Sequence, residues 1–279
     1  MEKCELYEER YQNKKSFSFG KNWLAFLQKL DDARIEKAKK SLIDFLGGEY
    51  VLRDKRFVDI GCGSGLFSLS AFLLGAKSVV SVDVDTSSVE GTRYLKHTFG
   101  NDSDSWKVVH GSILDQALVQ GLGTFDIVYS WGVLHHTGDM WTAIKNSVSL
   151  VKPEGLFYLA IYNERVGFQS SRFWWCVKSL YNRSNVVIKK IIELLFIIQF
   201  FAMGLIRFEN RFLYIKNYRS RRGMSWYTDV VDWLGGYPYE YCTVRTMKDF
   251  FDKRGFSLLN VKDCGDGTGC NEFLFKRGV

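Results

Sequence analysis

Three glycines, Gly61, Gly63 and Gly65, stand within five positions directly after the short apolar run FVDI. Glycine has no Cβ atom, so a turn built from these residues lets the backbone approach a ligand closely. The pattern is not GxGxxG, because Leu follows Gly65, and no Gly-Lys-Ser/Thr of a phosphate-binding loop is present. Asp59, at the end of the apolar run, would repel a phosphate at the start of the next helix. The turn is therefore expected to bind a cationic ligand rather than a dinucleotide.

A second carboxylate, Asp83, closes the next apolar run, SVVSVDV. In nucleotide-binding α/β folds a carboxylate at this point of the second strand binds the ribose hydroxyls. A nucleoside that carries a positive charge and no phosphate satisfies both carboxylates, and S-adenosylmethionine (SAM) is such a compound. We therefore predict SAM as the cofactor, S-adenosylhomocysteine (SAH) as its product, and no metal ion.

Two adjacent histidines, His135 and His136, follow the apolar run FDIVYSW in the stretch WGVLHHTGDMW. A free imidazole has a pKa of about 6.5 and accepts a proton readily near neutral pH. We predict that one of them, His136 in preference to His135, is the catalytic base. The alternative is that one imidazole packs beneath the next helix and bonds to a backbone carbonyl. Asp139 is expected to be the N-cap of that helix.

The elements that would position these residues alternate between strand and helix. Strands are predicted over 56–60, 78–84, 106–111, 125–131 and 156–162, and helices over 65–76, 86–99, 113–120 and 139–151. A helix over 243–255 and strands over 256–264 and 271–277 complete the pattern. The fold class predicted is α/β, with a doubly wound, mostly parallel seven-stranded sheet and an antiparallel C-terminal strand. N-terminal helices precede the sheet, and a helical insertion follows the fifth strand.

Three parts are predicted along the chain. Residues 1–54 would form an N-terminal helical cap, in which a helix over 21–46 stops at Gly47-Gly48. Residues 55–162 and 243–279 would form the cofactor-binding core. Residues 163–242 would form a basic and apolar helical insertion that acts as a lid or contacts the substrate, a membrane or a second copy of the chain.

The insertion carries most of the net charge of +7, with twelve Lys/Arg and six Asp/Glu between Asn163 and Glu240. Its most apolar segment, 186–206, has an uncharged run only from Leu194 to Ile206, shorter than the about 18 residues that cross a bilayer. We predict a buried lid or interface helix there. A helix lying on a membrane and a membrane span are the alternatives.

The N-terminal sequence MEKCELYEER is charged and does not resemble a secretory signal. The six cysteines are scattered and form no CxxC pair, which indicates reduced thiols. We therefore expect a cytoplasmic protein, with membrane association as a further hypothesis.

The motifs VDIGCGSG, SVDVD, HGSILD and FDIVYSWGVLHH resemble, in order and spacing, those of class I (Rossmann-like) SAM-dependent methyltransferases. The resemblance covers roughly residues 55–162 and 243–277, and the segments RGMSWYTDVVDWLGGYP and GCNEF are similar to a bacterial small-molecule subgroup. It implies that Asp59 and the turn Gly61, Cys62, Gly63 and Gly65 line the methionine part of SAM, and that Asp83 binds the ribose. It further implies that Val84 flanks the adenine, that Ser112 and Ile113 hold its edge, and that the backbone of Ser130 and Trp131 receives the amino group.

The leading hypothesis for the reaction is methyl transfer to a small-molecule acceptor, with a hydroxyl of a glycan, of a lipid-linked compound or of another anionic metabolite preferred. Cationic side chains in the insertion suit an acceptor that carries phosphate or carboxylate. The alternative is a tRNA-modifying transferase, because WGVLHH is similar to a stretch in wobble-uridine carboxymethyl transfer enzymes and a basic patch would hold phosphates. A scaffold without catalytic activity is a third reading. The predicted acceptor contacts are Tyr162, Asn163, Arg219, Arg221, Arg222 and Trp226.

Overall fold

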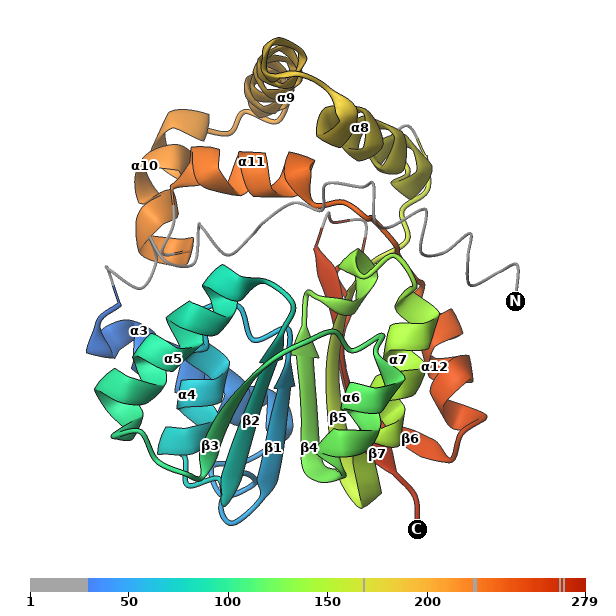
Figure 1. The fold of residues 1–279 in the computed structure, drawn as a ribbon. Helices are drawn as coiled ribbons and strands as arrows, with labels where there is room; N and C mark the ends of the chain where they lie inside the picture. Colours follow the sequence, from blue (N-terminus) through green and yellow to red (C-terminus); the bar gives the residue numbers. More distant parts are fainter. Residues whose placement is uncertain (1–29, 168, 223–224, 266, 268) are drawn as a thin grey trace. The chain divides into compact units, whose positions relative to one another are not determined.

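The computed structural model describes residues 30–167, 169–222, 225–265, 267 and 269–279, and for residues 219–222 the backbone alone (Figure 1). Among these residues, Trp175–Pro238 form one compact unit, and the residues up to Trp174 and from Tyr239 onward form another. We call them the helical unit and the sheet unit.

A seven-stranded sheet with the strand order β3-β2-β1-β4-β5-β7-β6 is the centre of the sheet unit. Strands β1 to β5 pair in parallel, whereas β7 pairs antiparallel with both β5 and β6. The predicted fold class is thereby confirmed. The strands are β1 (Arg56–Ile60), β2 (Ser78–Asp83), β3 (Trp106–His110), β4 (Phe125–Trp131), β5 (Val151–Tyr162), β6 (Phe256–Lys262) and β7 (Cys270–Arg277).

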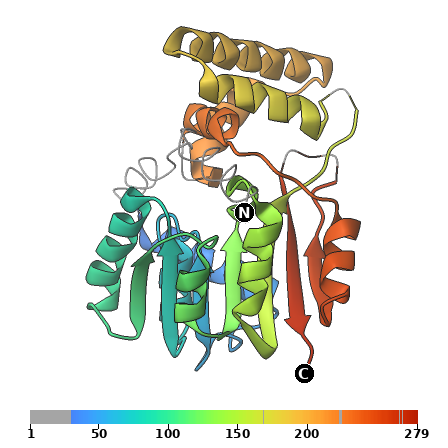
Figure 2. The same cartoon turned by 45° about the vertical axis from the view of Figure 1, so that its right-hand side comes forward.

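Helices cover both faces of this sheet (Figures 1 and 2). One face carries α3, α4 and α5, and the other carries α6, α7 and α12. Alternate residues of β1 enter the two cores, since Phe57 packs into the first and Val58 into the second. Burial on both faces explains why the β1 sequence RFVDI is an almost continuous apolar run. The helices are α3 (Asp32–Leu46), α4 (Leu66–Leu73), α5 (Thr86–Gly100), α6 (Gln116–Leu122), α7 (Met140–Ser149) and α12 (Val244–Asp252).

Most predicted elements of the sheet unit are confirmed to within a few residues, but the expected start of the fifth strand at residue 156 is wrong. Val151 already pairs with Phe125, and after a bulge Leu156 pairs with Ile127. The segment 152–155, expected to end the preceding helix, is this bulge, in which Glu154 takes a φ of 61°.

The first described helix, α3, is the later part of the predicted helix over 21–46, whose residues before 30 lie outside the described structure. It ends as predicted at Gly47, which has a φ of 91°. Aspartates start several of the later helices. Asp139 accepts a hydrogen bond from the Thr142 N–H at 3.1 Å, which confirms it as the N-cap of α7.

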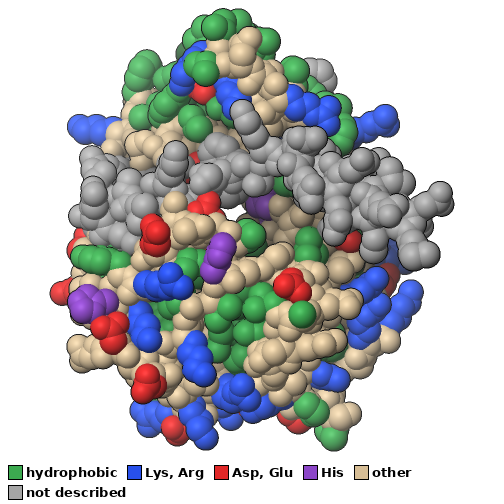
Figure 3. Space-filling view, viewed as in Figure 1, with side chains coloured by type: hydrophobic (Ala, Val, Ile, Leu, Met, Phe, Trp, Pro, Cys, Tyr) green, Lys and Arg blue, Asp and Glu red, His purple; other side chains and the backbone are tan. Residues whose placement is uncertain are grey.

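The helical unit contains the segment 186–206 as one continuous helix, α9, which α10 and α11 contact. Hydrophobic side chains are prominent on the surface of the helical unit (Figure 3). Within the described ranges, no helix combines the length and apolar character needed to cross a membrane. The helices are α8 (Ser171–Arg183), whose first turn belongs to the sheet unit, α9 (Val186–Ile206), α10 (Arg211–Arg222) and α11 (Trp226–Gly235).

Candidate active site

The glycine turn joins β1 to α4 and has a backbone that other residue types rarely adopt. Gly61, Gly63 and Gly65 take φ values of 74°, 53° and 78°. A Cβ atom on Gly61 would lie 2.3 Å from Cγ1 of Val133, and one on Gly65 would lie 2.7 Å from Oγ1 of Thr92. Two of the three glycines are therefore required by close packing as well as by backbone conformation.

Asp59 lies behind this turn, with only 2% of its surface exposed. It accepts a hydrogen bond from the Ser68 hydroxyl at 2.7 Å, and Ser68 accepts one from Ser81 at 2.6 Å. The Trp106 indole N–H donates in turn to Ser81 at 2.9 Å. Burial, together with a smaller effect of the charge of Asp83, raises the pKa of Asp59 to about 7, although the hydrogen bond from Ser68 acts in the opposite direction. A cation bound nearby would stabilise the ionised form.

Asp83 fixes the turn from the end of β2. Its carboxylate accepts hydrogen bonds from the Gly63 N–H at 2.9 Å and from the Asp85 N–H at 2.8 Å. Burial is the main cause of its raised pKa. Each carboxylate oxygen can accept more than one hydrogen bond, so these contacts are compatible with the predicted ribose contact.

The residues predicted to surround the adenine follow β2 and β3. Val84 is 68% exposed at the end of β2, and Ile113 is buried. The Ser112 hydroxyl accepts a hydrogen bond from the Leu114 N–H at 3.1 Å, and the Ile113 carbonyl accepts one from the Asn146 side chain at 2.8 Å. The loop that would hold the adenine edge is thus fixed by its own hydrogen bonds.

The remaining predicted cofactor contacts lie beside the turn or at the end of β4. Cys62 is buried, with its Sγ 3.3 Å from Oγ1 of Thr92. Ser130 is buried and its hydroxyl donates to the Ile60 carbonyl at 3.0 Å, which ties β4 to β1. Trp131, by contrast, is exposed.

All of these positions lie at the carboxyl edge of the sheet, around the junction of β1 and β4. The chain runs from β1 outward to β2 and β3 on one side of that junction, and from β4 outward to β5 on the other. Open α/β sheets bind ligands at such a point, where the strand order reverses. A turn too tight for a side chain, backed by the buried carboxylate of Asp59 and the half-buried one of Asp83, fits a cationic nucleoside such as SAM.

The two histidines lie in a short 3-10 helix, η1 (Leu134–His136), and have different environments. His135 is fully buried, and its Nδ1 accepts a hydrogen bond from the Tyr162 N–H at 3.4 Å. Its ring centroid lies 4.0 Å from that of Tyr162 and 4.4 Å from that of His136. His136 is half-buried and meets the Tyr162 ring edge-on at 5.3 Å.

The structure adds two residues that the sequence did not single out. Tyr239 lies 5.2 Å from Tyr162 between ring centroids, and the Glu240 N–H donates to the His135 carbonyl at 3.0 Å. The Glu240 carboxylate accepts from the Met140 N–H at 2.9 Å, and burial raises its pKa to about 7, with Asp139 adding to the effect. We call His135, His136, Tyr162, Tyr239 and Glu240 the histidine cluster.

Of the predicted acceptor contacts, Tyr162 alone belongs to the histidine cluster. The Asn163 side chain donates to the Gly265 carbonyl at 2.5 Å and accepts from Asn271 at 2.9 Å, so it ties β5 to the loop between β6 and β7. Trp226 belongs to α11, where its ring lies 4.6 Å from that of Phe200. The arginines at 219, 221 and 222 lie in the last turn of α10, and their side chains fall outside the described structure.

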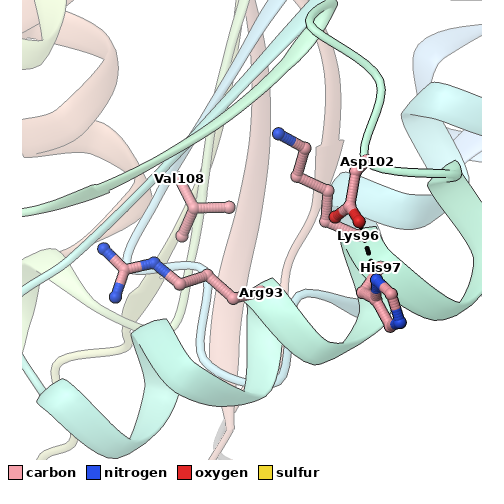
Figure 4. Close-up of a pocket in the computed structure, with 5 residues that line it drawn as sticks. All are labelled: Arg93, Lys96, His97, Asp102 and Val108. Carbon is pink, nitrogen blue, oxygen red and sulfur yellow. Dashed lines mark hydrogen bonds and ion pairs between the residues drawn. The ribbon is translucent and has the colours of Figure 1, made fainter.

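A surface depression lies beside α5 and β3, lined by Arg93, Lys96, His97, Asp102 and Val108 (Figure 4). His97 and Asp102 are 2.7 Å apart and both are largely exposed. Exposed pairs of this kind contribute little to stability. The depression contains none of the predicted site residues. Among the described residues, no group of three or more His, Cys, Asp or Glu side chains is arranged to hold a metal ion.

Comparison with known proteins gives one family match, described as a methyltransferase domain, over residues 31–261. A ubiquinone biosynthesis O-methyltransferase of Neisseria meningitidis is 28% identical over 44% of this chain and 50% of its own length. A ribosomal protein L11 methyltransferase of Clostridium botulinum is 31% identical over 46% of this chain and 38% of its own length. The chain thus spans about half or less of these curated relatives.

Solved structures share the fold at low sequence identity. A magnesium protoporphyrin IX methyltransferase from Synechocystis, crystallised with SAH, has a TM-score of 0.52 at 15% identity. The match covers 87% of this chain and 83% of that one. An O-methyltransferase family protein from Burkholderia thailandensis has a TM-score of 0.52 at 12% identity, over 88% of this chain and 55% of its own.

Proposed function

This chain belongs to the methyltransferase domain family, as a class I SAM-dependent methyltransferase, and from this premise we propose that it methylates a hydroxyl oxygen of a small-molecule acceptor. The observation that carries the proposal is the histidine cluster, which brings two imidazoles to the carboxyl ends of β4 and β5. A base is required there for an oxygen acceptor, because a hydroxyl must lose its proton as it is methylated.

The cofactor supplies an electrophilic methyl group on a sulfonium, and the chain supplies its binding site. We assign Asp59 and the glycine turn to the methionine part, and Asp83 to the ribose. Val84, Ser112 and Ile113 are assigned to the adenine, and the backbone at Ser130 and Trp131 to the amino group. The buried carboxylate of Asp59, the half-buried one of Asp83 and the close-packed turn support this assignment.

Within the histidine cluster we assign the base to His136 and a positioning role to His135. Nδ1 of His135 accepts a backbone N–H, which places the proton of a neutral imidazole on Nε2 and holds the ring against Tyr162. His136 retains solvent access and lies against both rings, as an imidazole that exchanges protons with an acceptor must. Glu240, bonded through its N–H to the carbonyl of His135, fixes the position of the pair.

The acceptor class rests on two observations. Curated relatives named for O-methyl transfer in ubiquinone biosynthesis support a hydroxyl acceptor. The excess of Lys and Arg in the insertion supports an acceptor with phosphate or carboxylate, such as a lipid-linked or glycan precursor. Tyr162 is the acceptor contact that we retain from the sequence, and a cytoplasmic location stays a prediction.

The test is to incubate the purified full chain with methyl-labelled SAM and a cell extract, and then to separate small molecules, lipids, RNA and protein. We expect the label in a small-molecule or lipid fraction, in a methyl ether, and its loss with the His136→Ala variant. Label in tRNA would favour the alternative of an RNA-modifying enzyme and would contradict the proposal. Label in protein, as the ribosomal protein methyltransferase among the relatives would suggest, would also contradict it.

A further inference from the structure

Helix α9 exposes a continuous apolar stripe along its whole length. Five of its members recur at intervals of three, four or seven residues, which places them on one face of an α-helix. Every member is at least half exposed. Surface helices normally present their polar face to water, so this orientation is the reverse of the usual one. The apolar stripe consists of Val187, Ile191, Leu194, Leu195, Ile198 and Leu205.

A buried hydrogen-bond network around Glu193 holds α9 in this orientation. Glu193, on the opposite face of the helix, is buried and accepts hydrogen bonds from the Tyr181 hydroxyl and from Lys190, both at 2.8 Å. The Tyr227 hydroxyl donates to the same carboxylate. Burial alone would raise the pKa of Glu193, but these three donors outweigh it and lower the pKa. Rotating α9 to bury the apolar stripe would expose the apolar side chains now packed on its other face and break the hydrogen bonds of Glu193 to Tyr181 and Tyr227.

Close packing at the far end of α9 fixes the helix a second time. Gly204 is buried, and a Cβ atom there would lie 2.2 Å from Cγ of Arg211 on α10. Beyond it, Phe208 and Phe212 are 98% and 76% exposed, so large apolar side chains continue past the end of the helix. Large exposed apolar surfaces of this kind mark interaction sites.

The charges of the helical unit indicate which kind of partner the apolar stripe binds. Between Trp175 and Tyr218 the chain has seven Lys/Arg, of which Lys178 is buried, and two acidic residues, Glu193 and Glu209. Both acidic residues are already paired inside the unit, Glu193 with Lys190 and Glu209 with Arg211. Two exposed basic side chains flank α9 in the sequence, Arg183 at the end of α8 and Arg207 directly after α9. A second copy of this chain would bring two basic surfaces together, whereas an anionic lipid surface complements both the apolar stripe and the cations.

We propose that α9 is an in-plane membrane helix, which docks its apolar stripe into the surface of an anionic bilayer while Lys and Arg side chains contact the lipid headgroups. The inference is independent of the acceptor, because it rests on α9 and its neighbours in the helical unit. It gives the insertion a role besides substrate contact.

The test is flotation of the full chain with vesicles of phosphatidylcholine alone and of phosphatidylcholine with an equal amount of phosphatidylglycerol. We expect binding to the anionic vesicles to be at least ~10-fold tighter, and to weaken with added salt. The double variant Leu194→Glu/Ile198→Glu should lose about 100-fold in binding, because it places two charges within the buried face. SAH binding by calorimetry should stay unchanged, which shows that the variant is folded.

Leu259→Glu provides the matched control, because Leu259 of β6 is 54% exposed and Leu194 is 56% exposed. The control should bind vesicles as the unmodified chain does. Equal binding of the double variant and the unmodified chain would overturn the proposal. A dimer that the double variant dissociates, in a chain that ignores both kinds of vesicle, would also overturn it and would assign the stripe to contact between copies.

Discussion

The buried carboxylate of Asp59 predicts how cofactor affinity changes with pH. Its pKa is raised to about 7 in the cofactor-free protein, chiefly by burial. A cationic ligand stabilises the ionised form, so binding is strongest above this pKa and weakens as the pH falls through it. With a pKa of about 7, roughly nine-tenths of the molecules are ionised at pH 8 and roughly one-tenth at pH 6. The apparent affinity should therefore fall about 10-fold between these values.

The assay is calorimetric titration with SAH, whose amino group stays positively charged over this range, for the unmodified chain and for Asp59→Asn. The asparagine can still accept the hydrogen bond from Ser68, so the buried chain of donors is kept. It cannot ionise, so its affinity should be low and nearly constant from pH 6 to pH 8. At pH 8 we expect a loss of about 1.5–3 kcal/mol, the contribution typical of a charged hydrogen bond.

Glu240 supplies the control for this measurement, because burial raises its pKa to about 7 as well, while its carboxylate bonds to the Met140 N–H. Glu240→Gln should therefore keep the 10-fold change in affinity. An SAH affinity of the unmodified chain that does not change between pH 6 and pH 8 would refute the electrostatic assignment of Asp59. The assignment is also refuted if the affinity of Asp59→Asn still changes with pH, or if that of Glu240→Gln no longer does.

Three further perturbations test the site. His136→Ala should leave SAH affinity unchanged and lower turnover by about 100-fold, as loss of a general base does; full activity in the labelled-methyl assay would reject this role. Gly61→Ala drives a Cβ to 2.3 Å from Val133, whereas Gly132→Ala, at the same φ of 74°, meets nothing within 4 Å. The first should therefore unfold at a lower temperature than the second, which bears only the backbone cost of roughly 1–2 kcal/mol; equal melting temperatures would contradict the packing argument. Above pH 7, Asp59→Asn should raise the melting temperature of the cofactor-free protein. The gain should shrink as the pH falls from 7 towards 4, because the native carboxyl is then protonated and only its ionised form is costly to bury. A gain in melting temperature that does not depend on pH would have a cause other than the ionisation of Asp59.

The sheet and the position of Asp59 and Asp83 at its carboxyl edge could be predicted from sequence because both depend on local patterns. A strand buried on both faces must be a continuous apolar run, which is why RFVDI indicates the bounds of β1 directly. The carboxyl ends of parallel strands meet at one edge, so the positions of Asp59 and Asp83 at two strand ends are enough to predict that they lie together. The start of β5 was not predictable in this way, because Val151 joins the sheet before a bulge whose sequence, KPEG, is typical of a turn.

Contacts between distant segments could not be predicted from the sequence. Glu240 bonds to the backbone of residues about a hundred positions earlier, and nothing in GGYPYEY indicates that contact. The orientation of α9 was hidden for a related reason. Its composition shows that the helix is apolar, but the side that faces outward depends on the partners of Glu193, which come from α8 and α11. Asn163 is a further example, since its position at a strand end does not indicate that its side chain bonds to two other segments, and its contact with the acceptor stays a prediction.

The role proposed for Asp59 accounts for a buried carboxylate that destabilises the protein when no cofactor is bound. Raising a carboxyl pKa from 3.8 to about 7 means that the ionised form costs about 4 kcal/mol to bury at neutral pH. This cost remains although Ser68 donates a hydrogen bond, because one hydroxyl cannot replace the water that surrounds a free carboxylate. A bound cation would offset much of it, whereas a phosphate would add to it. In the proposed site the same carboxylate would thus favour a positively charged nucleoside over an anionic nucleotide, and Asp83, close enough to raise the pKa of Asp59, would strengthen this preference.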